Sequence, residues 1–317
     1  MDVRSEVLRA LRSSGSPVSG EALAARLGVS RAAVSKHVQA LREMGYSIEA
    51  SPRRGYSLRS VPDLPLPFEV EEAVTDPIWV RFEGGGVTGS TNDDARALAT
   101  GGAPEGTVVL ASKQTGGRGR LGREWSSPEG GVYVSMVLRP DVPVAEMAAL
   151  SPCAALGVAE GLRSLGADVG VKWPNDVCAE GRKLAGVLLE LSAEQDRTEW
   201  VVVGVGVNHR RPPQPYPGAA YLETLLPSPA PAWSVAAAVL DGVGGAYSRF
   251  LEGGFAALAD DYARVDILLG SEVVARDPTG REIAAGVAAG LDVSGRLVVE
   301  TASGTVTLSA GDITLRQ

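Results

Sequence analysis

Residues 113–125, KQTGGRGRLGREW, place four glycines and four basic residues in thirteen positions of a chain whose formal net charge is −8. Backbone N–H groups and arginine side chains both suit phosphate oxygens, so the first question is which anion this segment binds. The usual phosphate-binding signatures are absent, because the chain has no GxxxxGKS or GxxxxGKT and its GVGVNH segment lacks the third glycine of a dinucleotide fingerprint. We predict a loop that is mobile when empty and orders around an anion, with a merely solvated basic loop as the alternative.

The segment GSTNDDARAL is a second place where polar groups gather. Ser90 and Thr91 stand at the predicted start of a helix, with Asp93 and Asp94 in its first turn. This arrangement is typical of helix capping, in which a side-chain oxygen accepts a hydrogen bond from a backbone N–H that the helix leaves unpaired. Capping alone is the commoner role of such a motif, so a role in binding needs support from the rest of the chain.

A third candidate lies in VKWPNDVCAEGRKLAGVLLE. We predict a strand, a turn set by Trp-Pro-Asn-Asp and a second strand that begins at Gly-Arg-Lys. Lys183 stands at the start of that second strand, and Gly186 allows another group to approach the backbone closely. These residues favour a positive charge that faces a cleft, although a lone lysine is usually a surface residue.

Composition excludes several other kinds of chemistry. Cys153 and Cys178 have no CxxC or Cys/His spacing, so we expect no structural zinc, no disulfide framework and no fixed protein site for a metal. His37 and His209 are the only histidines, which disfavours histidine-based hydrolysis. No apolar run approaches the roughly eighteen residues of a membrane helix, and the N-terminal segment is amphipathic and contains acids. We therefore expect a cytoplasmic protein with no membrane partner.

Charge divides the chain into a basic head and an acidic body. Residues 1–60 contain ten Arg or Lys against five Asp or Glu, a net charge of +5 that leaves −13 for the remainder. The length of 317 residues suggests two or three domains. This uneven distribution indicates that only the basic head meets nucleic acid.

The basic head has the pattern of a winged helix-turn-helix. After a first helix over 3–13, Ser19 and Gly28 delimit a short second helix, and Ser30 caps a third that runs to Met44. The third helix has one apolar stripe, which leaves its polar face free to enter a major groove. Two short strands around a Pro-Arg-Arg-Gly turn follow, and a small helical cap with solvated arginines is the alternative. The predicted DNA contacts are Ser30, Arg31, Ser35, Lys36, Gln39, Arg42, Arg53 and Arg54.

From residue 68 the pattern changes. The runs GTVVLASKQ, GVYVSMVLRP, ADVGVKW, KLAGVLLEL and WVVVGVGVNH have strand length and β-branched content. Their continuous apolar character predicts a sheet covered by helices, for which TNDDARALA, AEMAALSPCAALGVAEGLRSLG and SVAAAVLDGVGGAYSRFLEGG have the pattern. The last segment consists of short predicted strands separated by turns, as in a small β-barrel. The predicted division is a winged helix-turn-helix over 1–60, a proline-rich linker over 61–67, a central domain over 68–268 and a barrel over 269–317.

The motifs STN, EGTVVLASKQTGGRGRLGREW, KWPNDV, GRKLAGVLLE and GVGVN, in this order and at these intervals, resemble the biotin protein ligases. The preceding winged helix makes nearly the whole chain similar to the bifunctional members, which are both ligase and biotin operon repressor. The loop of residues 113–125, here called the arginine loop, and the KWPND…GRKLAG pair are together specific to that family, whereas a helix-turn-helix alone is not. The resemblance implies an α+β multidomain fold: a winged helix-turn-helix, a central mixed sheet of the class II aminoacyl-tRNA synthetase and biotin ligase type, and a C-terminal SH3-like β-barrel.

The resemblance also assigns roles to residues. In that family the Ser-Thr-Asn motif and the loop glutamine line the biotin head group, whose ureido ring suits hydroxyl and amide partners. The arginine loop closes over biotin and the adenylate, and the lysine contacts the reacting carboxylate and α-phosphate. The implied catalytic residues are Lys183, Arg118 and Arg120. The implied biotin contacts are Ser90, Thr91, Asn92, Gln114, Arg118, Gly119, Arg120, Lys183 and Gly186. The implied ATP or adenylate contacts are Arg120, Arg123, Trp125, Asn208 and Asp176, the last of which orients Lys183 or a metal-bound water.

The implied reaction has two steps. The carboxylate of biotin, the substrate, attacks the α-phosphate of ATP, which carries Mg²⁺, and the cations stabilise the charge that develops as two anions meet. The resulting biotinyl-5′-AMP then acylates a lysine of a biotin carboxyl carrier protein, a subunit of acetyl-CoA carboxylase. This chemistry needs no protein nucleophile and no tightly bound prosthetic group. Biotinyl-AMP is also implied to favour a homodimer that binds palindromic operator DNA and represses biotin genes.

Two other functions remain open. A lipoate or octanoyl ligase or transferase has a related fold, but those families do not share GRGRLGR and KWPND. A DNA-binding regulator that senses biotin with an inactive catalytic domain is the second alternative, and the presence of Lys183 and the loop arginines counts against it. The segment RRPPQPYPGAAYLETLLP departs from the family where it covers adenine, since no adenine-stacking side chain can be identified in it.

Overall fold

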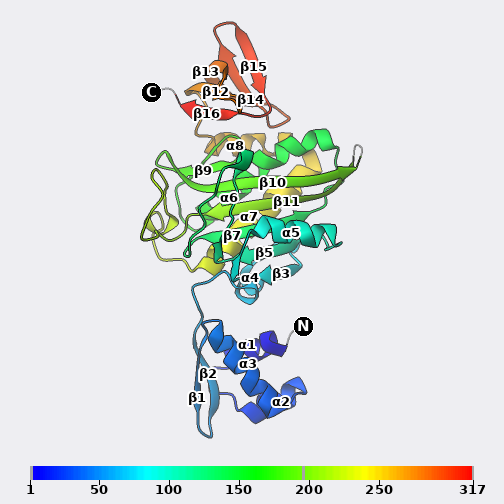
Figure 1. Cartoon of the computed structure of the whole chain (residues 1–317), viewed down its shortest axis with the longest axis vertical. Helices are drawn as coiled ribbons and strands as arrows, with labels where there is room; N and C mark the ends of the chain where they lie inside the picture. Colours follow the sequence, from blue (N-terminus) through cyan, green and yellow to red (C-terminus); the bar gives the residue numbers. More distant parts are fainter. Residues whose placement is uncertain (1–2, 195–196, 316–317) are drawn as a thin grey trace. The chain divides into compact units, whose positions relative to one another are not determined.

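The computed structural model describes residues 3–194 and 197–315, and the chain divides into two compact units, Met1–Asp63 and Leu64–Gln317 (Figure 1). The boundary falls within SVPDLPLP, in which proline removes backbone donors and disfavours regular structure. Among the described residues, no helix is long and apolar enough to cross a membrane.

The first unit consists of three helices and a two-stranded antiparallel sheet, as expected for a winged helix-turn-helix. Ser19 and Ser30 cap the second and third helices through hydrogen bonds that their side chains accept from backbone N–H groups. The predicted stripe of Val34, Val38 and Leu41 is buried, so the opposite face of the third helix is exposed. The elements are α1 (Val3–Ser13), α2 (Gly20–Leu27), α3 (Arg31–Glu43), β1 (Ser47–Ser51) and β2 (Gly55–Ser60).

The turn between β1 and β2 requires unusual backbone conformations. Arg53 has a φ of 66° and Gly55 a φ of 103°, in the left-handed region that favours glycine. A Cβ on Gly55 would lie 2.1 Å from the carbonyl oxygen of Val18, whose backbone pairs with Tyr56. The wing is therefore joined to the segment before α2, and the turn arginines are presented at its tip.

The second unit is built on a seven-stranded mixed sheet in the order β3-β5-β7-β11-β10-β9-β8. The β3 and β5 strands are parallel, and the other neighbours are antiparallel. The strands are β3 (Arg81–Gly84), β5 (Thr107–Ala111), β7 (Val132–Leu138), β8 (Gly170–Lys172), β9 (Asp176–Ala179), β10 (Arg182–Glu194) and β11 (Arg197–Val207). A short parallel pair, β4 (Val87–Thr88) and β6 (Lys113–Gln114), lies outside this sheet.

Two of these strands differ from the prediction. The KWPND…GRKL segment was predicted to form one strand, a turn and a second strand, whereas it contains the additional strand β9 between two turns. The strand β3 was not predicted either. Each has only four residues, which is too short to show a recognisable alternation of apolar and polar residues. Each forms a strand because it pairs with a neighbouring strand of the sheet.

Helices cover both faces of the sheet, as predicted (Figure 1). On one face, α6 and α7 bury the valines at odd-numbered positions of β11. These two helices approach closely through glycines, because a Cβ on Gly242 would lie 2.1 Å from the carbonyl oxygen of Gly157. On the other face, α5 packs on Val202 and Trp200. The helices are α4 (Pro67–Ala73), α5 (Thr91–Thr100), α6 (Leu150–Ser164), α7 (Ala232–Gly253) and α8 (Ala259–Val265).

The C-terminal part is a small five-stranded antiparallel sheet, consistent with the predicted SH3-like domain. Its core includes Trp173, which is 3% exposed and donates a hydrogen bond from Nε1 to the carbonyl oxygen of Gly295. The indole therefore ties the KWPND turn to this sheet. The strands, in the order β15-β14-β13-β12-β16, are β12 (Glu272–Arg276), β13 (Glu282–Leu291), β14 (Leu297–Thr301), β15 (Gly304–Leu308) and β16 (Asp312–Leu315).

Candidate functional site

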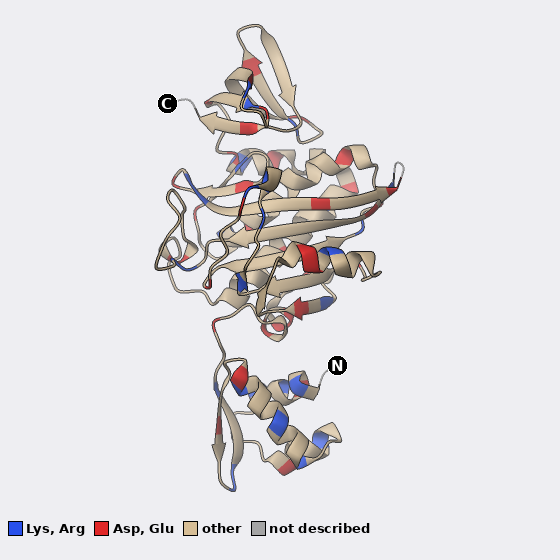
Figure 2. Cartoon of the chain, viewed as in Figure 1, with Lys and Arg blue, Asp and Glu red and all other residues tan. Residues whose placement is uncertain are grey.

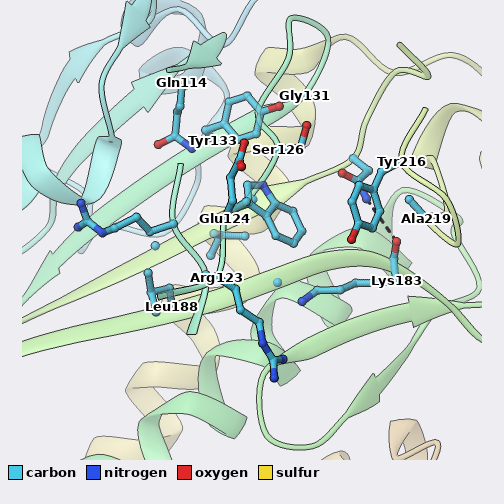
Figure 3. Close-up of a pocket in the computed structure, with 18 of the residues that line it drawn as sticks. Gln114, Arg123, Glu124, Ser126, Gly131, Tyr133, Lys183, Leu188, Tyr216 and Ala219 are labelled. Atoms are coloured by element: carbon cyan, nitrogen blue, oxygen red, sulfur yellow. Dashed lines mark hydrogen bonds between the residues drawn. The ribbon is translucent and has the colours of Figure 1, made fainter. Parts of the chain in front are cut away.

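A cavity of about 300 Å³ lies over β10 and β11 on the sheet face that carries α5. The arginine loop, the start of α5, the KWPND turn and the segment after β11 complete its walls. In Figure 3 the side chain of Lys183 points from its strand toward the middle of this cavity. Every residue predicted for biotin or the adenylate lines it: Ser90, Thr91, Asn92, Gln114, Arg118, Gly119, Arg120, Arg123, Trp125, Asp176, Lys183, Gly186 and Asn208.

Two glycines of β11 make room for the cavity. Side chains alternate between the faces of a strand, so the even-numbered residues of β11 face away from α6 and α7. A Cβ on Gly204 would lie 2.0 Å from Asn92 Oδ1, and a Cβ on Gly206 would lie 2.4 Å from Trp125 Nε1. The GVGV sequence is thus part of a strand without side chains on its cavity face. Its two glycines make room for the cavity and do not form a dinucleotide-binding turn.

The start of α5 faces the cavity instead of being capped. Ser90 occupies the N-cap position, but its side chain makes no capping hydrogen bond. Ser90, Thr91 and Asn92 are only 4–5% exposed, although all three are polar and line the cavity. The capping interpretation of this motif is therefore wrong for the side chain of Ser90.

A neutral hydrogen-bonded network forms this end of the cavity. Gln114 Oε1 accepts hydrogen bonds from the backbone N (2.8 Å) and the hydroxyl (3.1 Å) of Thr91, while its Nε2 donates to Ser127 Oγ at 2.9 Å. The buried Ser135 hydroxyl lies 2.7 Å from both Thr91 Oγ1 and Asn92 Oδ1. These groups include donors and acceptors without net charge, which suits a polar but uncharged ligand group.

Arg118 is held by two carboxylates. Its guanidinium donates to both oxygens of Asp93, at 2.5 and 2.9 Å, and to Glu190 Oε1 at 3.0 Å. The hydrogen bond with Asp93 is the main cause that raises the pKa of Arg118, and the same bond lowers the pKa of Asp93. The loop is therefore joined to α5 and to β10 at the neutral end of the cavity.

Arg120 and Arg123 differ in their partners. Arg120 donates to Asn175 Oδ1 at 3.0 Å, and Asn175, which is 8% exposed, is fixed by its own hydrogen bond to the backbone of β10. Burial lowers the pKa of Arg120, although an arginine remains charged at neutral pH. The more exposed Arg123 pairs with Asp312 of β16, and this hydrogen bond raises its pKa. The C-terminal sheet thus contributes a residue to the site.

Lys183 lies between a carboxylate and an aromatic ring. Its Nζ is 2.6 Å from Asp176 Oδ1 and 5.0 Å from the centroid of the Trp125 ring. A Cβ on Gly186 would lie 3.1 Å from Lys183 Cε, so a larger residue at this position would crowd the end of the lysine. Asn208 Nδ2 donates to the carbonyl oxygen of Lys183 at 3.3 Å, which connects the end of β11 to the start of β10. The prediction that Lys183 faces a cleft is confirmed.

Several lining residues were not predicted. Asn175 belongs to the KWPND motif, and Tyr216 and Tyr221 are the aromatic residues of the proline-rich segment, so their motifs gave a usable signal. Tyr133 hydrogen-bonds the carbonyl oxygen of Pro128, and burial raises its pKa. Asp312 has no local signal, because its place in the site depends on the packing of the C-terminal sheet.

The predicted DNA-binding residues lie at the N-cap of α3, along α3 and in the wing of the first unit, and Figure 2 shows Lys and Arg positions along this unit. Ser30 Oγ caps α3, and Arg42 donates two hydrogen bonds to the carbonyl oxygen of Ile48. The side chains of Ser30 and Arg42 therefore already have structural partners. Gln39 has one as well, because its amide donates a hydrogen bond to Glu43 at 3.3 Å. The remaining predicted contacts are exposed: Arg31, Ser35, Lys36, Arg53 and Arg54.

Comparison with protein families matches three parts of the chain. Residues 84–208 match the biotin/lipoate A/B protein ligase family, residues 3–57 match an HTH domain, and residues 268–316 match the biotin protein ligase C terminal domain. The matched segments coincide with the region around the cavity, the first unit and the C-terminal sheet.

Individual relatives cover most of the chain. The chain is 35% identical to the bifunctional ligase/repressor BirA of Bacillus subtilis (strain 168), over 94% of both proteins. It is 40% identical to the bifunctional ligase/repressor BirA of Escherichia coli (strain K12), over 63% of this chain and 62% of that protein. Among solved structures, the biotin protein ligase from Aquifex aeolicus in complex with biotin and ATP superposes with a TM-score of 0.65 at 28% identity, covering 75% of this chain and all of that one.

Proposed function

The chain belongs to the biotin protein ligase family, among whose bifunctional ligase/repressor members it has full-length relatives, and we propose that it forms biotinyl-5′-AMP and transfers biotin to a carrier protein. Biotin and ATP give biotinyl-AMP and pyrophosphate, and a lysine of a biotin carboxyl carrier protein then takes the biotinyl group and releases AMP. One observation carries the proposal: a single cavity has neutral hydrogen-bonding groups at the start of α5 and a second region that contains Lys183, Arg120 and Arg123.

The uncharged end suits the ureido ring of biotin. The ring carbonyl is an acceptor and its two N–H groups are donors, so it needs partners of both kinds. Thr91, Asn92 and Gln114 provide hydroxyl and amide groups, and all three are held by hydrogen bonds to neighbours. Ser90 and Gly186 complete this proposed biotin site, and Arg118 and Gly119 close it from the loop.

The cationic region suits the first chemical step. A biotin carboxylate oxygen attacks the α-phosphorus of ATP, a P–O bond to biotin forms, and the bond to pyrophosphate breaks. Lys183 would contact both the carboxylate and the α-phosphate, and Arg120 and Arg123 would reach phosphate oxygens, so that repulsion between the two anions falls. Trp125 and Asn208 would line the nucleotide side, with Asp176 holding the lysine in place.

We further propose that Mg²⁺ enters with ATP. Among the described residues no group of three or more His, Cys, Asp or Glu side chains is arranged to hold a metal, so phosphate oxygens and water would supply most of its ligands. Asp176 and Asp312 are carboxylates that line the cavity and could contact the ion directly or through water. The ion would neutralise phosphate charge during attack on the α-phosphate.

The second step needs the carrier lysine as nucleophile and no nucleophile from this chain. The carrier amine attacks the acyl carbon of biotinyl-AMP, an amide bond forms, and AMP leaves with its phosphate. Cys153 and Cys178 are both buried, and burial raises the pKa of the Cys178 thiol to about 11, so neither is a thiolate at neutral pH. The closed arginine loop would shield the mixed anhydride from water until the carrier arrives.

The first unit extends the proposal to repression. We propose that α3 enters the major groove of operator DNA, that the wing arginines contact phosphates, and that biotinyl-AMP favours a homodimer able to read a palindrome. The proposal includes domain limits of 1–60, 68–268 and 269–317 around the linker 61–67, and a cytoplasmic location where ATP and the carrier are found. Operator binding in the presence of biotin and ATP, and its fall with rising salt, would be measured by fluorescence anisotropy.

One experiment separates the ligase from its alternatives. The protein is incubated with ATP, Mg²⁺, a carrier domain and either biotin or lipoate, and the intact carrier is weighed by mass spectrometry. A mass gain that corresponds to biotin is expected. A gain with lipoate alone would identify a lipoate ligase, and no gain together with biotin-dependent DNA binding would identify a regulator without ligase activity.

A further inference from the structure

The arginine loop is a narrow hairpin with Trp125 at one of its feet. Trp125 N donates to the carbonyl oxygen of Gly117 at 3.0 Å, and Gly119 N donates to the carbonyl oxygen of Arg123 at 2.7 Å. These backbone bonds join the two sides of the loop. Whatever holds Trp125 against the sheet therefore also holds the loop over the cavity.

The indole of Trp125 rests on two glycines. Gly186 of β10 and Gly206 of β11 are direct partners in the pairing of these two adjacent strands. A Cβ on Gly206 would lie 2.4 Å from Trp125 Nε1, and a Cβ on Gly186 would lie 3.2 Å from Cζ3. The buried Nε1 has no hydrogen-bond partner among the described residues, so the contact is one of packing. A side chain at Gly206 would push the ring away, and one at Gly186 would crowd it.

The same ring holds the ammonium of Lys183. Lys183 Nζ lies 5.0 Å from the ring centroid, and on its other side it lies 2.6 Å from Asp176 Oδ1. A cation is attracted to the face of an indole, and the ion pair fixes it from a second direction. An open loop would take the indole away, and Lys183 would then lose one of these two restraints.

We infer that Trp125 is a positioning residue that couples closure of the arginine loop to the orientation of Lys183. The inference rests on the proposed function, since it concerns the lysine that would contact the reacting carboxylate and phosphate. The loop and the lysine belong to different elements, and Trp125 belongs to the loop while its indole contacts the ammonium of Lys183. The ammonium is then set for adenylate formation only when the loop covers the cavity.

The test compares Trp125→Leu with Trp125→Phe. Both lose the indole N–H, but only phenylalanine keeps an aromatic face for the ammonium. We expect kcat for biotinyl-AMP formation to fall about tenfold or more with leucine and about threefold with phenylalanine, while KM for biotin changes by less than about threefold. Trp233→Phe is the matched control, because Trp233 Nε1 is also buried without a partner but lies outside this cavity, and it should leave kcat unchanged.

A second readout needs no turnover. Trypsin cleavage after Arg118, Arg120 and Arg123 is followed by mass spectrometry in the protein without ligands. The variant Gly206→Ala is included because its new methyl group would displace the indole from the side of the sheet. Cleavage should be faster in Trp125→Leu and Gly206→Ala than in the wild type. If Trp125→Leu and Gly206→Ala both have the kcat and the cleavage rate of the wild type, the inference is overturned. If Trp125→Leu and Trp125→Phe have the same kcat, the contact between the ring and the ammonium is not what matters. If the wild type forms no biotinyl-AMP, the proposed function fails, while the cleavage rates still judge the anchoring of the loop.

Discussion

Gly204→Ala should weaken biotin binding through a single displaced side chain. The new Cβ would lie 2.0 Å from Asn92 Oδ1 and 2.8 Å from its Cγ, closer than packed atoms allow. Asn92 cannot simply swing away, because it is 5% exposed and its Oδ1 accepts a hydrogen bond from Ser135 Oγ at 2.7 Å. Overpacking of this kind typically costs about 1–3 kcal/mol. If that cost falls on the uncharged end of the cavity, the Kd for biotin should rise roughly 5- to 150-fold.

Isothermal titration calorimetry with biotin measures this effect, and ATP binding serves as the internal reference. Gly245→Ala is the matched control, because a Cβ there has no neighbour within 4 Å, and its affinity should equal that of the wild type. Removing the obstructing side chain with Asn92→Ala should make the second change at Gly204 nearly silent. Wild-type affinity in Gly204→Ala, or simple additivity in the double variant, would refute the reasoning.

Three further predictions concern charged residues. Lys183→Ala should slow biotinyl-AMP formation about 100-fold or more while the Kd for biotin changes little, and equal losses in both would contradict its role in the reaction. The hydrogen bond from Arg118 lowers the pKa of Asp93 below its ordinary 3.8, so protection of the loop from hydrogen exchange should persist above pH 3.8 and be lost as pH falls through the lowered value. Asp93→Asn should abolish that step, and an unchanged pH profile would refute the ion pair. Arg31→Ala and Lys36→Ala should each weaken operator binding and reduce its salt slope by about 1, whereas an unchanged slope would exclude phosphate contact.

Local chemistry made the first unit predictable from the sequence. The caps at Ser19 and Ser30 and the glycine at 28 act within a few residues, so their effect does not depend on distant packing. The buried stripe of α3 follows from helical periodicity for the same reason. The long strands and helices of the second unit were predictable on similar grounds. The four-residue strands β3 and β9 were not, since their neighbours in the sheet define them.

The cavity was predictable in its residues but not in its contacts. The resemblance to biotin protein ligases named many of the lining residues, and these come from four places in the chain that meet around one volume, but it did not name others such as Asp312. The pairing of Arg118 with Asp93 and Glu190 could not be read from the sequence, because α5, the loop and β10 come together only in the folded sheet. The same holds for Asp312, which reaches Arg123 from β16.

These contacts distinguish the cations that sequence alone treats alike. Arg118 is neutralised by two carboxylates, Lys183 pairs with Asp176, and Arg123 pairs with Asp312. Arg120 instead donates to the amide oxygen of Asn175. Within the described part of the chain, its carboxylate neighbours attract it through charge alone and accept no hydrogen bond from it. A half-buried cation without an ion pair has the most to gain from an incoming anion, because burial has already removed part of its hydration. We therefore expect Arg120 to be the loop residue that contacts the charged ligand, whereas the hydrogen bonds of Arg118 fasten the loop to α5 and β10.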